Sequence, residues 1–386
     1  MEMRYLIMKK QKVWFRLIAL ATVLMIPLFS FVIAKRDHDV GAKLRPTKFV
    51  FQKGMNLSAW LSQTSMNTSA QLAYFTQKDL QELADLGFDH VRLPFNENQL
   101  YTVRGKRIEE TFTIIHRLID WCKQANMRII LDCHQTYDHD FSKYNEIVLF
   151  KEPAAQARFE LLWQKLSAEF GKYPNELVAY EILNEPNSKD PVAWNIVANK
   201  IVKVIRDLEP ERIIFLGSNK ANRVTTFPDL QIPKNDPNII LSFHFYYPYL
   251  LTHYKADFYK AIKDIDVPIS YPGQIVSDSV VNTLDEAGKK VMKNYNGVYN
   301  KESMAALMKP AIDIAKKAGL RIHCGEFGCN FAYPDKALQV RWMKDIVAIF
   351  KENDIPYTVW GYRRQFGVFN DSKKIKDRAY LDAIVK

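Results

Sequence analysis

The stretch Val178-Ala-Tyr-Glu-Ile-Leu183, followed at once by Asn184-Glu185-Pro186-Asn187, decides the fold. Its first six residues form a short run that is almost wholly apolar, which is typical of a parallel β-strand buried on both faces. The polar tetrapeptide then places a carboxylate directly after that strand. Taken alone, Asn-Glu-Pro-Asn is equally consistent with an ordinary turn, because Asn and Pro are common in turns. The rest of the chain decides between these two interpretations.

Seven further runs of this kind occur along the chain, and most are followed by a segment with helical periodicity. The eight predicted strands are Phe49–Leu57, His90–Leu93, Arg128–Asp132, Val178–Leu183, Ile213–Gly217, Ile239–Phe243, Arg321–Gly325 and Tyr357–Trp360. The predicted helices are Gln77–Leu86, Thr111–Ala125, Ala154–Phe170, Val192–Leu208, Met304–Ala318 and Lys336–Glu352. Alternating strands and helices indicate βα units, and eight such units predict an α/β fold of the closed (β/α)8 TIM barrel type. The alternative is an open doubly wound sheet, although no GxGxxG motif follows the first run.

A second carboxylate follows the seventh predicted strand. This strand reads Arg321-Ile-His-Cys324 and continues into Gly325-Glu326-Phe327-Gly328. The fourth and seventh strands of an eight-stranded barrel lie across the barrel from each other, so Glu185 and Glu326 can face one another over a cleft. Hydrolysis of a glycosidic bond needs such a pair, one acid for the leaving oxygen and one carboxylate at the anomeric carbon. The matching positions make a simple turn a weaker explanation for both.

Polar and aromatic side chains also stand at the ends of other predicted strands. They are Arg92, His134, His244, Tyr246 and Trp360. Each has a structural explanation when it is taken alone, such as an ion pair, a core histidine or a core aromatic ring with one polar tip. Together they predict a sugar-binding site at the C-terminal face of the barrel, where the active sites of such barrels lie.

Six short motifs, in their order along the chain, resemble the motif set of glycoside hydrolase family 5, the cellulase-type (β/α)8 enzymes. The motifs are Gly54-Met-Asn-Leu57, His90-Val-Arg-Leu-Pro94, Asn184-Glu185-Pro186, His244-Phe-Tyr246, Gly325-Glu326-Phe327-Gly328 and Trp360. The resemblance spans roughly residues 50 to 370. It implies a retaining β-glycosidase.

The resemblance implies that Glu185 is the acid/base and Glu326 the nucleophile. It also implies that Asn184 contacts the sugar 2-hydroxyl and that Arg92 supports the nucleophile. These roles agree with the chemistry, because an acid that works at neutral pH needs a raised pKa. The nucleophile must instead stay ionised, which a nearby guanidinium favours.

The remaining roles are also implied by the resemblance. His134 and His244 would bind substrate and line the site, Tyr246 would hydrogen-bond the nucleophile, and Trp360 would stack on a sugar ring. One departure stands in Leu131-Asp-Cys-His-Gln135, since many members of the family have two successive histidines there. His134 matches the first histidine, and Gln135 replaces the second.

We therefore expect a retaining endo-β-1,4-glucanase that hydrolyses a β-linked polysaccharide or oligosaccharide without a metal or an organic cofactor. Within the same family, β-mannan, mixed-linkage glucan and xyloglucan are alternative substrates, and endo or exo action stays open. A non-catalytic cell-surface glycan-binding protein is the alternative from a different class. Both glutamates and Arg92 argue against that alternative.

The N-terminal region predicts export. Leu17 to Ala34 is an uncharged apolar run of 18 residues with basic residues on both sides. Its length lies between that of a signal-peptide core and the ~20 residues that span a bilayer. We expect residues 1–36 to be a signal-anchor or a signal peptide that is cleaved after Ala34, residues 37–48 a tether, and residues 49–386 the catalytic domain. The domain would face the periplasm or the extracellular space, or be secreted if cleavage occurs.

The net charge of +11 does not indicate nucleic-acid binding, because it is concentrated at the N-terminus. Residues 1–53 hold eleven Lys and Arg but only three Asp and Glu, and the remainder has no basic stripe. We expect a monomer without a nucleic-acid partner. Four cysteines are too few for a disulfide framework, so buried thiols are expected, with Cys324–Cys329 as the alternative disulfide. The long aromatic segment 245–303 is expected to be an ordered loop at the active-site face.

Overall fold

The computed structural model describes residues 48–141, 147–333 and 335–386. The predicted membrane or signal segment 1–36 therefore lies outside the described residues, as does nearly all of the predicted tether 37–48. Within the described ranges, no helix is both long and apolar enough to cross a membrane.

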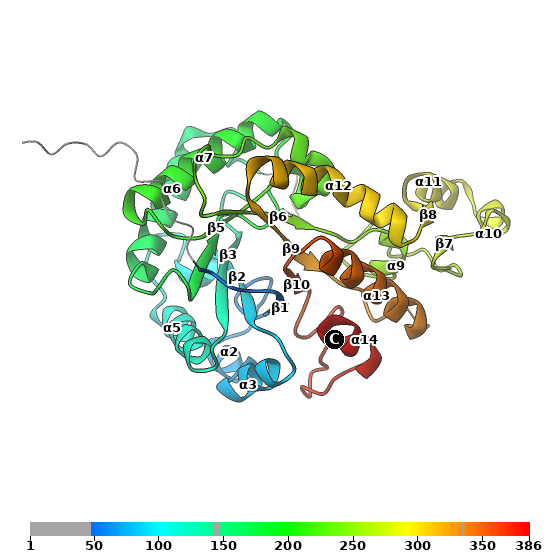
Figure 1. Cartoon of the computed structure of the whole chain (residues 1–386), viewed down its shortest axis with the longest axis horizontal. Helices are drawn as coiled ribbons and strands as arrows, with labels where there is room; N and C mark the ends of the chain where they lie inside the picture. The colour runs from blue at the N-terminus through cyan, green and yellow to red at the C-terminus, as the bar shows by residue number, and fades with distance from the viewer. Residues whose placement is uncertain (1–47, 142–146, 334) are drawn as a thin grey trace, which may run out of the picture. The chain divides into compact units, whose positions relative to one another are not determined.

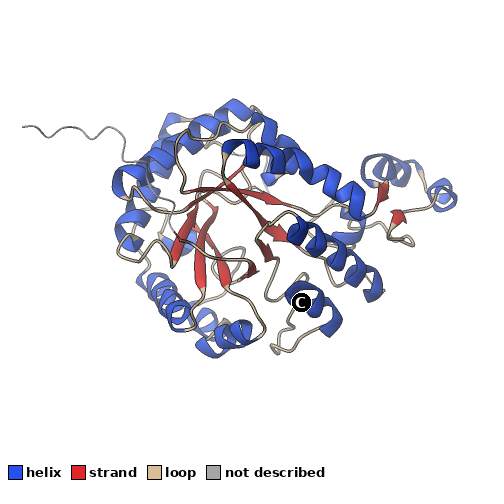
Figure 2. Cartoon of the chain, in the orientation of Figure 1, coloured by secondary structure: helices blue, strands red, loops and turns tan. Residues whose placement is uncertain are grey.

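Eight parallel strands close into a barrel, as Figures 1 and 2 show. The strands are β1 (Lys53–Asn56), β2 (His90–Asn96), β3 (Arg128–Gln135), β4 (Val178–Glu181), β5 (Ile214–Gly217), β6 (Ile239–His244), β9 (Arg321–Phe327) and β10 (Tyr357–Val359). The order around the barrel is β1-β10-β9-β6-β5-β4-β3-β2, and every neighbouring pair is parallel. The closed barrel is confirmed, each predicted run overlaps one of these strands, and the open sheet is excluded.

Helices surround the strands, and the apolar face of each helix is buried against the barrel (Figure 2). The six predicted helices are present as α3 (Gln77–Asp85), α5 (Glu109–Gln124), α6 (Pro153–Phe170), α7 (Pro191–Leu208), α12 (Lys301–Ala318) and α13 (Lys336–Glu352), and α14 (Arg378–Val385) follows β10. Short helices α2 (Thr68–Tyr74) and α4 (Glu97–Leu100) lie in the loops after β1 and β2. Local sequence sets these ends: Thr76 caps α3 in a capping box with Asp79, and Gly319 ends α12 in a left-handed conformation.

The fifth βα unit departs from the repeat. Between β5 and β6 the described chain forms a short turn, α8 (Asn219–Asn222), and a 3-10 segment, η1 (Val224–Asp229), in place of a long α-helix. Pro228 lies inside η1, and proline lacks the N–H that a continuing helix needs. Helix α12 packs against η1.

The long segment after β6 is an ordered insertion, which confirms the expectation for residues 245–303. It contains α9 (Tyr249–Thr252), β7 (Gly273–Gln274), α10 (Asp278–Thr283), α11 (Glu286–Tyr295) and β8 (Val298–Tyr299). β7 and β8 pair as a two-stranded antiparallel sheet. Figure 1 shows α10, α11, β7 and β8 together at one side of the barrel, whereas α9 lies closer to its strands.

The barrel interior has an apolar end and a polar end. Phe49, Phe51 and Phe215 pack with small and branched residues of the neighbouring strands in one buried cluster. Charged side chains from β2, β3, β4 and β9 fill the opposite end. All four cysteines are buried and free, so Cys324 and Cys329 do not form the alternative disulfide.

Candidate active site

Arg92 is the centre of a buried network at the C-terminal mouth of the barrel. It lies on β2 and is fully buried. Its Nε lies 2.6 Å from Glu181 Oε2, and its Nη2 lies 2.8 Å from Asn184 Oδ1 and 3.1 Å from Asp132 Oδ2. Its Nη1 donates to Glu326 Oε1 at 2.9 Å. A guanidinium suits this position because its planar donors can bind several carboxylates at once.

Glu326 lies on β9 with both carboxylate oxygens hydrogen-bonded. Arg92 donates to Oε1, and the Tyr246 hydroxyl donates to Oε2 at 3.0 Å. The end of β6 is fixed against the same strand, because the Phe245 N–H donates to the Glu326 carbonyl at 2.9 Å. The carboxylate is thus held in one orientation by two elements of the barrel.

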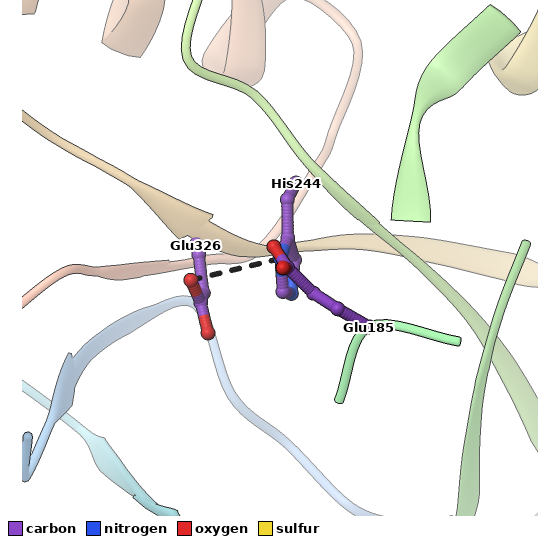
Figure 3. A group of neighbouring side chains, drawn as sticks. All are labelled: Glu185, His244 and Glu326. Atoms are coloured by element: carbon purple, nitrogen blue, oxygen red, sulfur yellow. Dashed lines mark hydrogen bonds and ion pairs between the residues drawn. The ribbon is translucent and has the colours of Figure 1, made fainter. Parts of the chain in front are cut away.

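Glu185 follows β4 and faces Glu326 from the other side of the site. His244 Nδ1 lies 2.8 Å from Glu185 Oε1 and 3.6 Å from Glu326 Oε2 (Figure 3). One carboxylate oxygen of Glu185, one of Glu326 and a ring nitrogen of His244 all lie within 4.8 Å of one another. The Glu185 side chain is 18% exposed, more than its two neighbours, so it stands where a substrate can reach it.

The surroundings of the two glutamates shift their pKa values. Burial raises the pKa of Glu185 to about 7, against smaller opposing effects of His134 and Arg92. Burial also raises the pKa of Glu326, and the charges of His244 and Arg92 oppose that rise. Burial lowers the pKa of His244 to about 4, so this ring is neutral at pH 7. Arg92 is therefore the permanent cation beside Glu326 that opposes the rise of its pKa at neutral pH.

His134 and Trp360 form a flat wall of the site. Their rings are stacked with centroids 5.6 Å apart and planes 5° apart. His134 Nδ1 lies 2.7 Å from Asp132 Oδ2, which fixes the imidazole, and Trp360 stays partly exposed. The side chain of Gln135, the residue after His134, bonds to Asn96 and Asp140.

The structure brings together all eight residues that the sequence singled out: Arg92, His134, Asn184, Glu185, His244, Tyr246, Glu326 and Trp360. Sequence reasoning missed three buried partners of Arg92, namely Asn56, Asp132 and Glu181. For Asp132 and Glu181 the signal was a carboxylate inside an otherwise apolar strand, since such a group must be paired when it is buried. Glu181 stands in the run with which the sequence analysis began.

Two carboxylates and one imidazole are also a ligand set that a divalent metal can use. The contacts of Glu326 disfavour that use. Both of its oxygens already accept hydrogen bonds, one of them from the fixed positive charge of Arg92, which a metal ion would have to approach. The arrangement fits a pair of reacting carboxylates better than a metal centre.

Comparison with known proteins gives a consistent result. Residues 50–365 match the cellulase family, glycosyl hydrolase family 5. Endoglucanase C of Acetivibrio thermocellus is 31% identical over 332 residues, which cover 84% of this chain and 95% of that protein. Cellodextrinase A of Ruminococcus flavefaciens is 28% identical, over 78% of this chain and 83% of that protein.

Among solved structures, the cellulose synthase subunit Z of Clostridioides difficile has a TM-score of 0.70 and 21% identity, covering 87% of this chain and all of that one. Thermotoga maritima Cel5A, in complex with mannotriose, has a TM-score of 0.68 and 19% identity, covering 87% of this chain and 98% of that one. At these identities the two structures support the fold of the barrel.

Proposed function

Because the chain belongs to glycosyl hydrolase family 5, we propose that it is a retaining endo-β-1,4-glucanase with Glu185 as acid/base and Glu326 as nucleophile. The observation that carries the assignment is the closeness of the two carboxylates, since one oxygen of Glu185 and one of Glu326 lie within 4.8 Å of each other. Retaining enzymes hold their carboxyl groups about 5–5.5 Å apart, whereas inverting enzymes need about 6.5–9.5 Å to admit a water molecule. The spacing supports direct attack by Glu326.

The first step replaces the glycosidic bond by a bond to the enzyme. An oxygen of Glu326 attacks the anomeric carbon while the bond to the leaving oxygen breaks, and Glu185 gives its proton to that oxygen. Tyr246 and Arg92 hold the attacking carboxylate in place. Asn184 accepts a bond from Arg92 through Oδ1, which leaves its amide N–H groups for the sugar 2-hydroxyl.

The second step regenerates the enzyme. The ester at Glu326 carries no negative charge, so the pKa of Glu185 falls and Glu185 can take a proton from water. That water attacks the anomeric carbon and releases the Glu326 carboxylate, with net retention of configuration. Trp360, stacked on His134, would hold the apolar face of the sugar ring during both steps.

The test is reducing-end release from soluble β-glucan, glucomannan and xyloglucan by the full chain and by two variants. Glu326→Gln is expected to abolish hydrolysis without loss of fold, and Glu97→Gln, a glutamate outside the pair, serves as the matched control. With an aryl β-cellobioside and azide, Glu326→Ala is expected to form an α-glycosyl azide and Glu185→Ala a β-glycosyl azide. A fully active Glu326→Gln variant would overturn the assignment.

The preferred polymer is part of the same measurement. The name of the relative endoglucanase C supports β-glucan as the substrate class. Glucomannan is included in the comparison because a solved barrel with the same fold binds mannotriose. Oligosaccharide binding without turnover on any polymer would instead support the non-catalytic glycan-binding protein.

We also propose that residues 1–36 export the enzyme and keep it at the membrane. The support is the uncharged run from Leu17 to Ala34 and its basic flanks. A tether of residues 37–48 spans at most about 40 Å when extended, so the enzyme would act on soluble or newly made glucan near the membrane. Carbonate extraction of membranes and N-terminal sequencing test this, and a mature N-terminus at Lys35 would contradict the anchor.

A further inference from the structure

The turn after β5 has a backbone conformation that its residues do not favour. Lys220, Ala221 and Asn222 have φ values of 54°, 62° and 52°. This left-handed conformation brings Cβ close to the following carbonyl oxygen, so it costs free energy in every L-residue that carries a Cβ. Strained residues persist only where surrounding contacts hold them, and they gather at functional sites. The contacts of this turn therefore indicate what its conformation achieves.

The first part of the turn holds the chain that follows Glu185. The Asn219 side chain accepts from the Ser188 N–H at 2.8 Å and donates to the Ser188 carbonyl at 3.0 Å. The Ala221 N–H donates to the Pro186 carbonyl at 3.1 Å. Asn219 and Ser188 are both buried, so water does not compete with the bonds between them. The residues after the acid/base are thus fixed to the turn.

Asn222 holds the chain that precedes Glu185. Its Nδ2 donates to the Asn184 carbonyl, which belongs to the peptide that joins Asn184 to Glu185. The Asn184 N–H is held from the other side, because it donates to the Cys133 carbonyl of β3 at 3.0 Å. The Asn184 side chain accepts from Arg92. The Asn222 amide therefore helps to fix the peptide plane from which the Glu185 side chain starts.

The end of β5 leaves room for the Asn222 amide. Asn222 is fully buried, and Gly217 lies directly against it. A Cβ at position 217 would lie 2.0 Å from Asn222 Oδ1 and 2.6 Å from Asn222 Nδ2, so a larger residue there would force the amide to move. Glycine at this position allows the amide to reach the Asn184 carbonyl. A methyl group at position 217 is therefore an independent means of displacing the amide.

The position of Glu185 matters because it must give its proton to one particular oxygen. Proton transfer needs the two heavy atoms about 2.6–3.2 Å apart, and a displacement of about 1 Å can lower a rate about a hundredfold. We propose that Asn222 is a positioning residue for the acid/base, and that its bond to the Asn184 carbonyl holds the Glu185 carboxyl where the leaving oxygen of the glucan is protonated. His244 supports the same carboxyl directly, with Nδ1 2.8 Å from Glu185 Oε1 (Figure 3). The inference rests on the proposed function and adds to it a residue outside the six family motifs.

The test compares two substrates with the full chain and its Asn222→Gly variant, which removes the amide and suits the left-handed backbone. Cellotetraose has a leaving sugar whose oxygen must be protonated, whereas a dinitrophenyl β-cellobioside has a leaving group that needs no proton. The ratio of kcat/KM for cellotetraose to kcat/KM for the aryl glycoside is expected to fall roughly ten- to hundredfold. The reason is that only the first reaction depends on where the Glu185 carboxyl stands.

Gly217→Ala tests the same contact from β5. Its added methyl group is expected to push the Asn222 amide away from the Asn184 carbonyl and to lower the ratio in the same direction. In combination with Asn222→Gly the methyl group meets no amide, so the double variant is expected to give the ratio of Asn222→Gly alone. A ratio for the double variant well below that value would overturn the inference. A folded Gly217→Ala variant decides the question if Asn222→Gly does not fold.

Asn195→Ala is the matched control. Asn195 is a buried asparagine that also bonds to the connection between β5 and β6, through the Asp229 carbonyl at 2.8 Å and the Gln231 N–H at 3.0 Å. This variant is expected to leave the ratio within about twofold of the wild-type ratio.

A folded Asn222→Gly variant whose ratio stays within about twofold of wild type would overturn the inference, even if both activities fall together. An equal fall of the ratio in Asn195→Ala would overturn it as well, because any loosening of the connection would then have the same effect. Failure of the wild-type chain to cleave the aryl glycoside would instead overturn the proposed function.

Discussion

The two ends of the barrel interior are filled in opposite ways. At the apolar end, Phe51 contacts the rings of Phe215, His90 and His323 edge to face, with centroids 5.1 to 5.5 Å apart. At the mouth, Arg92 is surrounded by carboxylates. The first end is held by apolar burial and a few hydrogen bonds, while the second concentrates charge where the reaction is proposed to occur.

Hydrogen bonds link the polar groups at the apolar end to one another. His90 Nε2 and His323 Nε2 both lie 2.8 Å from Thr358 Oγ1, and His90 Nδ1 lies 2.7 Å from Asp89 Oδ1. If His90 donates to Asp89, it accepts from the Thr358 hydroxyl, which in turn accepts from His323. Burial lowers the pKa of His323 well below its usual range, so the His323 ring is neutral in this arrangement. One end is therefore linked by hydrogen bonds around a single threonine hydroxyl, whereas the other stays stable only while its charges remain balanced.

The largest expected effect follows from removal of the central cation. Arg92→Met leaves Glu181, Asp132 and Glu326 buried without a positive partner, and breaking a buried ion pair in this way costs about 3–5 kcal/mol. We expect an unfolding free energy lower by that amount and no measurable glucanase activity. Urea unfolding followed by fluorescence gives the first quantity and reducing-end release the second.

The control for this prediction is a second buried arginine that lies away from the mouth. Arg212 lies 2.6 Å from Glu209 and donates to the Val178 carbonyl at 2.7 Å. Arg212→Met is expected to lower stability while the folded protein keeps its kcat. A loss below about 1 kcal/mol in Arg92→Met would show that the carboxylates at the mouth are protonated and need no cation.

The next effect is the pH dependence of the two glutamates. The acid form of Glu185 is the active one, and with a pKa of about 7 its population falls as pH rises through 7. We expect kcat/KM to decline about tenfold per pH unit above that value. Glu326 must be ionised, and because burial raises its pKa, the acid limb is expected above the ordinary glutamate value.

Initial rates across pH 4 to 9 on a soluble β-glucan check both limbs. Glu185→Gln, assayed with a dinitrophenyl β-cellobioside whose leaving group needs no proton, is expected to lose the alkaline limb. An alkaline limb that survives in this variant would assign it to a group other than Glu185.

The same comparison explains what the sequence could and could not predict. The strands, six helices and both glutamates were predictable, because apolar periodicity and residues at strand ends are local signals. Glu181 was not recognised, since its pairing with Arg92 depends on which face of β4 points inward. The need for glycine at position 54 could not be predicted for the same reason. A Cβ at Gly54 would lie 2.1 Å from His90 Nε2, and this contact exists only because their two strands are neighbours in the barrel. The tyrosines of the insertion were visible only as composition, and their arrangement required the structure.

A smaller effect is expected when the hydrogen-bond network around Thr358 at the apolar end is broken. Thr358→Val keeps the volume of the side chain but leaves the Nε2 atoms of His90 and His323 without their common partner. Burying polar atoms without a partner costs about 1–3 kcal/mol, so the unfolding free energy is expected to fall by that amount. The kcat on β-glucan is expected to stay near the wild-type value, and a large loss of kcat at unchanged stability would show that this end is coupled to the mouth.

The smallest effect, with the opposite sign, is expected at Ser242 on β6. Its hydroxyl is buried, and among the residues that the structure describes it has no hydrogen-bond partner. Burial of the Ser242 hydroxyl costs free energy that no hydrogen bond offsets. Ser242→Ala removes that hydroxyl, so the unfolding free energy is expected to rise by about 0.5–1 kcal/mol. Urea titrations of Ser242→Ala and Thr358→Val measure the change in unfolding free energy of each variant. With equal m values, the two changes are expected to have opposite signs. A loss above about 1 kcal/mol in Ser242→Ala would mean that this hydroxyl is bonded in solution, and that the interior next to the mouth depends on polar contacts as strongly as the network around Thr358 does.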